Sequence, residues 1–259
     1  MEKLSVVIIA GNEEKNIRDC LESVKWADEI ILIDSESNDN TREIAKKYTS
    51  HIYLKKWEGF VAQRKFSIDK TSYDWVLSID ADERVEEKLM LEIKELLNSN
   101  NEKNGYWIPR QNYFLNKVIK TCGWYPDYQM RLFNKNFVRL SDRKVHEGFE
   151  VDGKTGRLNN HLIHFTHQNI TDTIKKINDY SYLQALEKKD GKRVKAINLI
   201  LNPVAAFLNH FIGRKGYKDG IHGLMVSLIH MMTNLLTYMK TWELQNKMKV
   251  VDETKNTIG

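Results

Sequence analysis

Cysteine and proline are both scarce in this chain, which has only Cys20, Cys122 and three prolines among its 259 residues. Two thiols so far apart in sequence exclude a disulfide framework or a clustered zinc site, and they favour a reducing compartment. With few prolines and no repeated or Ser/Gly-rich stretch, long linkers and repeat arrays are also excluded. The remaining composition, 41% apolar and 29% charged, is typical of a folded chain with a sizeable core.

Several common motifs are absent as well. The chain has no GxxxxGK[ST] phosphate loop, and no GxGxxG follows its first apolar run. The acids of "SIDADERV" lack the turn glycine and closing glutamate of a calcium loop. The opening "MEKLSVVIIAGNEE" has a short apolar run and no small-residue cleavage site. We expect it to form a first strand rather than a signal peptide.

Short apolar runs rich in β-branched residues alternate with amphipathic segments over the first hundred residues, which is typical of strands alternating with helices. The runs predict strands at Leu4–Ala10, Asp28–Asp34, 51–57 and Asp74–Asp80. Asn12 is the predicted N-cap of the first helix, and residues 60–71 are predicted to form another. This alternation predicts an α/β fold with a mostly parallel sheet flanked by helices.

Polar side chains stand where three of these strands end. Asn12 and Glu13 come after the first strand, Asp34 ends the second, and Asp80 and Asp82 come at the end of the fourth. Because ligands of open α/β folds bind at the carboxyl ends of the strands, these side chains are expected to form one site.

Asp80 and Asp82 carry the most specific chemical signal. In an extended segment, residues i and i+2 share a face, so both carboxylates can meet one ion while Ala81 points away. Like charges packed this closely repel one another unless a cation is present. Sparse oxygen ligands with room for water and phosphate suit Mg²⁺ or Mn²⁺. We therefore predict a divalent cation that bridges these aspartates to a diphosphate.

Composition changes twice along the chain. The predicted first domain, 1–170, is divided at the turn-rich "NSNNEKNG" into a nucleotide half, 1–100, and an aromatic-rich acceptor half, 101–170. Flat aromatic rings suit sugars and apolar chains. Residues 171–259 are predicted to form a helical, basic and amphipathic region.

This C-terminal region carries the positive charge of the protein. Residues 188–249 hold eleven Lys/Arg against three Asp/Glu, whereas the whole chain has a net charge of +5. Two uncharged runs, Ala196–Gly213 and Ile221–Met239, flank a basic turn, but their Asn and His residues are a heavy polar load for spanning helices. We expect a helical hairpin in a membrane interface. Soluble packing or a homodimer contact is one alternative, and a pair of spanning helices is the other.

Four segments resemble the nucleotide-sugar-binding half of family-two inverting glycosyltransferases, which have the GT-A fold: "SVVIIAGNEE", "ADEIILIDSESNDNT", "WEGFVAQRK" and "DWVLSIDADERV". The resemblance continues through "GWYPDYQMRLF", "VHE" and "KDGIHGL". Within the family it is greatest to the β-1,4-glucosyltransferases of lipopolysaccharide inner-core assembly. It implies a nucleotide-sugar donor such as UDP-glucose and a glycolipid acceptor. The expected location is cytoplasmic, on the inner face of the cytoplasmic membrane.

The resemblance also implies roles for single residues. Asp34 is similar to the aspartate that binds the nucleobase, and Asn12 and Glu13 match the pair that lines the nucleotide pocket. Arg64 resembles the arginine beside the diphosphate, although Lys65 stands where the family usually has Asn. The Asp-x-Asp pair matches the metal-binding motif.

Inverting transfer is a single displacement at the anomeric carbon, so a carboxylate must take the proton of the acceptor hydroxyl. By resemblance this base lies downstream, which makes Glu147 the first candidate and Asp127 the second. Arg131 is expected to bind a phosphate or to pair with Asp127. His164 and His167 alternate onto opposite faces, so at most one joins the site. For His164, a third metal ligand and a core histidine are both open.

Other functions share parts of this pattern. A polyprenyl-phosphate glycosyltransferase would use the same donor site with an acceptor that is already ionised, and a transferase for capsule or other surface glycans would differ only in its acceptor. A nucleotidyltransferase is expected to have a Gly-rich basic loop where this chain has "AGNEEKN". A non-catalytic adaptor would explain the basic C-terminus but not the converging acids, so no nucleic-acid partner is expected.

Overall fold

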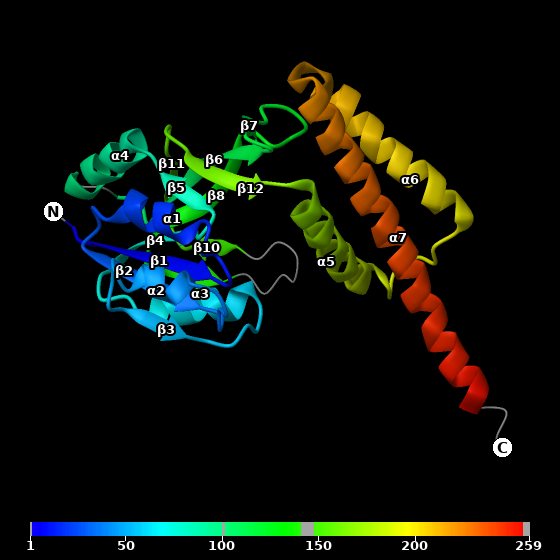
Figure 1. The fold of residues 1–259 in the computed structure, drawn as a ribbon, viewed down its shortest axis with the longest axis horizontal. Helices are drawn as coiled ribbons and strands as arrows, with labels where there is room; N and C mark the ends of the chain where they lie inside the picture. The colour runs from blue at the N-terminus through cyan, green and yellow to red at the C-terminus, as the bar shows by residue number, and fades with distance from the viewer. Residues whose placement is uncertain (1, 100–101, 141–147, 256–259) are drawn as a thin grey trace. The chain divides into compact units, whose positions relative to one another are not determined.

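The computed structural model describes residues 2–99, 102–140 and 148–255. Side chains are described for the same residues except 140 and 247–255. The chain divides into two compact units, whose elements Figure 1 labels. Unit 1 comprises Met1–Asn112 and Pro126–Thr166, and unit 2 comprises Tyr113–Tyr125 and His167–Gly259.

Unit 1 is built on a mixed sheet with a parallel half and a mainly antiparallel half (Figure 1). The parallel strands lie in the order β3 (Ile52–Leu54), β2 (Glu29–Asp34), β1 (Leu4–Ala10) and β4 (Trp75–Asp80). The order continues with β8 (Asp127–Asn134), β6 (Gly105–Phe114), β12 (Leu162–His167) and β5 (Glu83–Val85). The shorter strands are β9 (Val138–Leu140), β10 (Phe149–Val151) and β11 (Thr155–Arg157). The predicted α/β fold with a mostly parallel sheet is confirmed for the nucleotide half.

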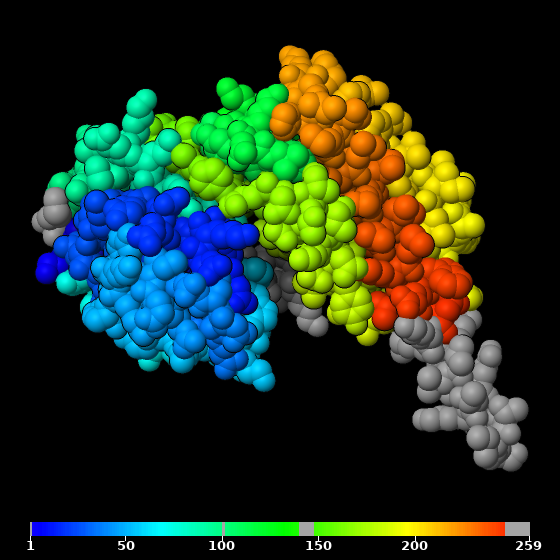
Figure 2. Space-filling view, viewed as in Figure 1, coloured from blue at the N-terminus to red at the C-terminus, as the bar shows by residue number. Residues whose placement is uncertain are grey.

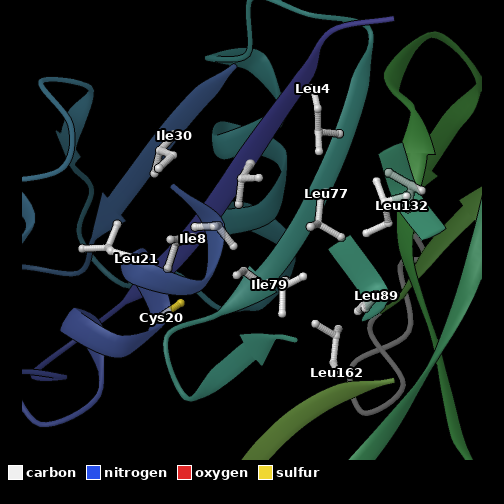
Figure 3. Packing of buried hydrophobic residues seen from close by; sticks show 14 of the residues in the cluster. Leu4, Ile8, Cys20, Leu21, Ile30, Leu77, Ile79, Leu89, Leu132 and Leu162 are labelled. Carbon is white, nitrogen blue, oxygen red and sulfur yellow. The ribbon is translucent and has the colours of Figure 1, made fainter. Parts of the chain in front are cut away.

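Helices cover the sheet of unit 1 and pack against its two clusters of buried residues. These helices are α1 (Ile17–Val24), α2 (Thr41–Ala45), α3 (Phe60–Asp69), α4 (Glu87–Asn98) and the 3₁₀ turn η1 (Lys135–Phe137). Cys20, Leu21 and Leu89 of α1 and α4 point into the larger cluster, toward Ile8 and Leu77 of the sheet (Figure 3). Strand β1 is buried along its whole length, which is why its sequence is a continuous apolar run.

The start of α1 differs from the prediction. Asn12 as its N-cap is wrong, because α1 begins at Ile17 and its N-cap is Asn16. Asn12 instead has a left-handed backbone with φ 57°, a conformation that asparagine tolerates better than most residues. Glu36, in the loop after β2, has the same φ. Such backbone strain clusters at functional sites, and both loops lie at the edge where ligands are expected.

Unit 2 is mainly helical, as the sequence predicts for the C-terminal region. Its elements are β7 (Lys117–Val118), α5 (Ile170–Lys188), α6 (Ala196–Leu208), the π-helical turn η2 (Asn209–Gly213), the 3₁₀ turn η3 (Gly216–Asp219) and α7 (Ile221–Lys255). Helices α5 and α6 both pack against α7 (Figure 1).

The turn between α6 and α7 is fixed by Asp219 and a glycine pair. Asp219 Oδ2 accepts hydrogen bonds from the backbone N–H of Lys120 and from the backbone N–H and hydroxyl of Thr121, at 3.0, 3.0 and 2.6 Å. A Cβ at Gly223 would lie 1.8 Å from the carbonyl oxygen of Gly216. Only glycine allows this approach, which gives "KDGIHGL" a structural reason.

Two stacked histidines lie beside this turn. The rings of His210 and His230 are 3.7 Å apart and almost parallel, and Trp124 Nε1 donates to His230 Nε2 at 3.1 Å. Burial, together with the neighbouring His210 and Arg214, lowers the pKa of His230 to about 3. Both effects keep the His230 ring neutral.

We expect acidification to destabilise the protein through His230. Its pKa in the folded state is below the unfolded value of about 6.5, so the unfolded state binds more protons between the two values. The contribution of His230 to the free energy of unfolding is therefore fully present above about pH 6.5. It decreases as the pH falls, by about 2 kcal/mol at pH 5. Urea unfolding of His230→Gln should show a smaller loss between pH 7 and pH 5 than wild type or the control His51→Gln. Equal losses in all three would contradict the assignment.

Candidate active site

Strands β1, β2 and β4 end at one edge of the sheet in unit 1. Ala10 lies opposite Asp34 in the pairing of β1 with β2, and Ile9 lies opposite Asp80 in the pairing of β1 with β4. Asp34 and Asp80 therefore end the two strands that flank β1. The strand-end residues chosen from the sequence do meet at one edge.

Asp34 is fully buried and is held by its own loop. Ser37 donates to it twice, from its backbone N–H to Oδ2 at 2.9 Å and from its hydroxyl to Oδ1 at 2.5 Å. Arg42 Nε lies 3.6 Å from Oδ2. Ser37 is a residue that the sequence analysis missed, although an Asp followed three residues later by Ser is a signal of a local side-chain turn. These contacts fix the orientation of the Asp34 carboxylate.

Asn12 and Glu13 join the loop after β1 to the loop after β2. Asn12 donates its backbone N–H to Ser37 Oγ at 2.9 Å, and its side-chain Oδ1 accepts from the backbone N–H of Asn38 at 2.8 Å. Glu13 donates its backbone N–H to Thr41 Oγ1 at 2.8 Å. The two residues therefore shape the edge beside Asp34.

Asp80 ends β4 with each carboxylate oxygen facing a guanidinium group. Arg131 Nη2 donates to Oδ2 at 2.5 Å, and Arg64 Nη2 lies 3.9 Å from Oδ1. Burial acts to raise the pKa of Asp80, but the charges of Arg131 and Arg64 outweigh it and hold this pKa well below its usual range. Arg64 also lies over the rings of Phe60 and Phe149, at 5.5 and 5.4 Å from their centres.

Arg131 also binds a buried acid, Glu83. Glu83 Oε1 accepts from Arg131 Nη2 at 2.7 Å and lies 3.3 Å from Arg110 Nη1, while its Oε2 accepts from the backbone N–H of Asp80 at 3.0 Å. Arg131 does not form the ion pair with Asp127 that was one of its two expected roles. Arg110 binds Asp127 Oδ2 instead, through Nε and Nη2, at 2.9 and 2.6 Å. Arg131 is only 2% exposed, which opposes its predicted contact with a phosphate.

Asp82 is linked to the carboxylate of Asp127 through His164 and Asn112. Asp82 Oδ2 lies 3.5 Å from His164 Nε2, and His164 Nδ1 lies 2.6 Å from Asn112 Oδ1. Asn112 Nδ2 donates to Asp127 Oδ2 at 3.4 Å. His164 is placed here because β12 pairs with β5, with His164 opposite Glu83. His164 therefore lies at the same edge of the sheet as Asp82.

These contacts form a chain of polar side chains from Asp80 to Asp82 at the end of β4. The backbone of Ala81 joins the two aspartates and closes the chain, which we call the polar ring. Its members come from β4, β5, β6, β8, β12 and the turn after β4: Asp80, Arg131, Glu83, Arg110, Asp127, Asn112, His164 and Asp82. The ring fixes the direction of both aspartates of the Asp-x-Asp motif. Arg110, Asn112 and the pairing role of Glu83 were not predicted from the sequence. A charged residue inside an apolar strand, as in "YWIPRQNYF", is the signal that could have found Arg110.

His164 Nε2 and Asp82 Oδ2 lie 3.5 Å apart in the polar ring, and both are atom types that bind divalent cations. Asn112 Nδ2 donates to Asp127, so Asn112 Oδ1 faces His164 and accepts from Nδ1–H. In a neutral imidazole the lone pair is then on Nε2, the atom that faces the carboxylate of Asp82. A cation at this point would be bound by both groups. Among the described residues, no three His, Cys, Asp or Glu side chains are already grouped as a metal site.

Of the two candidate bases, Asp127 and Glu147, the structure describes only Asp127. Asp127 is held by Arg110 and by Gln129, whose Nε2 donates to Oδ1 at 2.7 Å. Burial acts to raise the pKa of Asp127, but Arg110 and the Gln129 hydrogen bond outweigh it and lower that pKa below its usual range. Glu147 lies outside the described residues.

An α/β sheet with acids at its carboxyl edge has its polar groups where ligands of this class of fold bind, and comparison with known proteins gives the family. Residues 5–146 match the model of the family described as "Glycosyl transferase family 2". The chain therefore belongs to glycosyl transferase family 2, and its unit 1 has the GT-A fold. It is an enzyme, a glycosyltransferase that uses nucleotide sugars.

Individual relatives agree with this family. The chain is 32% identical to an uncharacterized glycosyltransferase of Rickettsia typhi, over 100% of this chain and 93% of that protein. It is 28% identical to the lipopolysaccharide core biosynthesis glycosyltransferase LpsC of Rhizobium meliloti, over 93% of this chain and 92% of that protein. Among solved structures, S. aureus TarS 1–349 in complex with UDP-GlcNAc is similar over 95% of this chain and 91% of that chain, with 12% identity and a TM-score of 0.48.

Proposed function

We propose that this enzyme transfers glucose, with inversion, from UDP-glucose to a glycolipid acceptor such as the lipopolysaccharide core, at the inner face of the cytoplasmic membrane. The observation that carries the proposal is the orientation of Asp80 and Asp82 by the polar ring at the carboxyl edge of the sheet. The acceptor class is supported by the similarity to LpsC, which extends over 93% of this chain.

On this proposal the nucleotide binds along the edge formed by the ends of β1 and β2. Asp34 faces the nucleobase, and Asn12 and Glu13 line the pocket beside it. Arg64, which is near Asp80 and 12% exposed at its side chain, faces the diphosphate. The hydrogen bonds of Ser37 support these roles, because they fix the loop before a nucleotide arrives.

Asp80, Asp82 and His164 would hold Mg²⁺ or Mn²⁺, which supplies positive charge to the leaving diphosphate. The protein contributes the orientation of these groups. Arg131 and Glu83 fix Asp80, and Asn112 fixes the tautomer of His164.

We propose Glu147 as the base that accepts the proton of the acceptor hydroxyl. The hydroxyl oxygen forms a bond to the anomeric carbon while the bond to the diphosphate breaks, so the oxygen must lose its proton as it attacks. The lowered pKa of Asp127 makes that carboxylate a weak base, which supports Glu147.

Replacing Glu147 with glutamine is expected to lower kcat by about 10²-fold or more, because the proton loses its acceptor. KM for the donor should change little. The matched change Asp127→Asn is expected to cost less in kcat, and it should lower the melting temperature because Arg110 loses a partner. Steady-state kinetics and thermal unfolding of both variants measure this. An unchanged kcat in Glu147→Gln would indicate an acceptor that is already ionised, such as a polyprenyl phosphate.

The donor is tested by a screen of nucleotide sugars with purified protein. With Mn²⁺ present, UDP-glucose is expected to raise the melting temperature and to be hydrolysed faster than UDP-galactose, UDP-N-acetylglucosamine or GDP-mannose. EDTA should abolish the hydrolysis. A greater response to another donor would overturn glucose as the transferred sugar, and no response to any donor would overturn the site.

A further inference from the structure

The outward side of α6 and η2 in unit 2 is apolar along its whole length. Six aliphatic side chains are 46–62% exposed: Ile197, Ile200, Leu201, Val204, Leu208 and Ile212. They recur every three or four residues, so they form one stripe along the helix. Figure 2 shows this helix, in yellow, at the surface. We call the stripe the α6 face.

The other side of this helix also carries apolar side chains. Pro203 is buried, and Phe207 and Phe211 are half-buried and stacked, with their centres 5.4 Å apart. Over Ala196–Gly213, all of which the structure describes, the mean hydropathy is 1.4, yet only 6% of the residues are buried. By length and composition this segment could cross a membrane. A segment with this mean hydropathy ordinarily lies inside a protein or in lipid.

The charge around α6 indicates what covers its exposed face. Between residues 191 and 218 there is no Asp or Glu. Six exposed cations lie at the two ends of the helix: Lys192, Arg193, Lys195, Arg214, Lys215 and Lys218. An 18-residue helix is about 27 Å long, so the cations flank the apolar stripe at both ends. Such a helix suits the surface of an anionic bilayer, where apolar side chains enter the acyl boundary and cations bind phosphates.

The second uncharged run, which lies in α7, differs from the first because it packs against other helices of unit 2. Ser227 and Thr237 are 0% and 1% exposed, and Thr237 Oγ1 donates to Gln184 Oε1 of α5 at 2.9 Å. Helix α7 packs against both α5 and α6. The two runs look alike in sequence, but α7 has its partners within unit 2, whereas the α6 face has none among the described residues.

We propose that α6 lies flat in the surface of an anionic lipid bilayer, with the α6 face among the acyl chains and the flanking Lys and Arg side chains on lipid phosphates. The inference deepens the proposed function and rests on its membrane-bound acceptor. It assigns lipid binding to α6 rather than to both helices of the hairpin.

The test is co-sedimentation of the full-length protein with vesicles of phosphatidylcholine, with and without phosphatidylglycerol. Wild type is expected to bind the anionic vesicles, and added salt should weaken this binding. Leu201→Gln is expected to weaken it about tenfold. Leu91→Gln on α4 is the matched control, because Leu91 is 55% exposed and Leu201 is 56% exposed. Lys192→Gln/Lys195→Gln should weaken binding about 25-fold to anionic vesicles only.

Three outcomes would overturn the proposal. Equal binding of wild type and Leu201→Gln would remove the α6 face from the contact. A dimer in light scattering that Leu201→Gln dissociates, without vesicle binding by wild type, would make the face an interface between two copies. If the protein stays in cell membranes after alkaline carbonate extraction, α6 spans the bilayer instead of lying on its surface. UDP-glucose hydrolysis by the same preparations separates the two proposals, because it tests the donor site without lipid.

Discussion

Asp82→Asn is expected to lower kcat/KM for the nucleotide sugar on the order of 10³-fold, because it removes one charge from the predicted cation site without changing its shape. Asp82 is the better choice of the two aspartates, since Asp80 also anchors Arg131, whereas Asp82 contacts His164 at 3.5 Å. The loss should therefore concern the cation rather than the fold.

Binding of Mn²⁺ in the presence of UDP, followed by electron paramagnetic resonance, gives a readout that does not depend on turnover. The Kd for Mn²⁺ is expected to rise in Asp82→Asn and in His164→Ala, while the melting temperature of the metal-free Asp82→Asn protein stays near that of wild type. Asp69→Asn at the exposed end of α3 is the control for a lost carboxylate. If Asp82→Asn binds Mn²⁺ as wild type does, the proposed cation site is wrong.

Arg131→Met is expected to have the largest effect on stability, a loss of about 3–5 kcal/mol. Arg131 is 2% exposed and Glu83 is 0% exposed, so methionine leaves the charge of Glu83 buried with only Arg110 beside it. For a chain of this length the loss corresponds to a fall in melting temperature of about 10 °C. Donor use should fall as well, because Asp80 loses the group that orients it.

Two further variants separate a buried charge from a general effect of the substitution. Adding Glu83→Gln to Arg131→Met should restore part of the lost stability, since it removes the unpaired acid, but it should not restore activity. Arg139→Met removes the same type of side chain from an exposed ion pair with Asp152, and the melting temperature should hardly change. A melting temperature of Arg131→Met equal to that of Arg139→Met would contradict the buried ring.

Local pattern was sufficient to predict the parallel half of the sheet. Strand β1 is apolar at every buried position, and β2 and β4 are continuous apolar runs that end in Asp34 and Asp80. Burial on both faces of the sheet requires continuous apolar runs, so such runs in the sequence predict buried strands. Loop geometry was less readable. Asn12 looked like a helix cap, but its left-handed backbone depends on contacts with Ser37 and Asn38, which come from another loop.

Charged residues of the acceptor half could not be paired from the sequence. From the sequence, Arg131 was expected to be available to a phosphate, but it is buried between Asp80 and Glu83. Asp127 was a candidate base, but it is paired with Arg110. These partners lie 17 to 51 residues apart in the chain. Their pairing depends on the antiparallel order of β4, β8 and β6, which has no short sequence signal.

The sequence by itself determined the chemistry that this protein offers: strand-end acids, an Asp-x-Asp motif and a basic, apolar C-terminal region. Side-chain types and spacing are local properties, and local properties are written in the chain. Tertiary structure alone decided which charges neutralise each other and which apolar face stays uncovered, as the polar ring and the α6 face illustrate. Burial and pairing depend on neighbours brought together by folding, so no single segment contains that information.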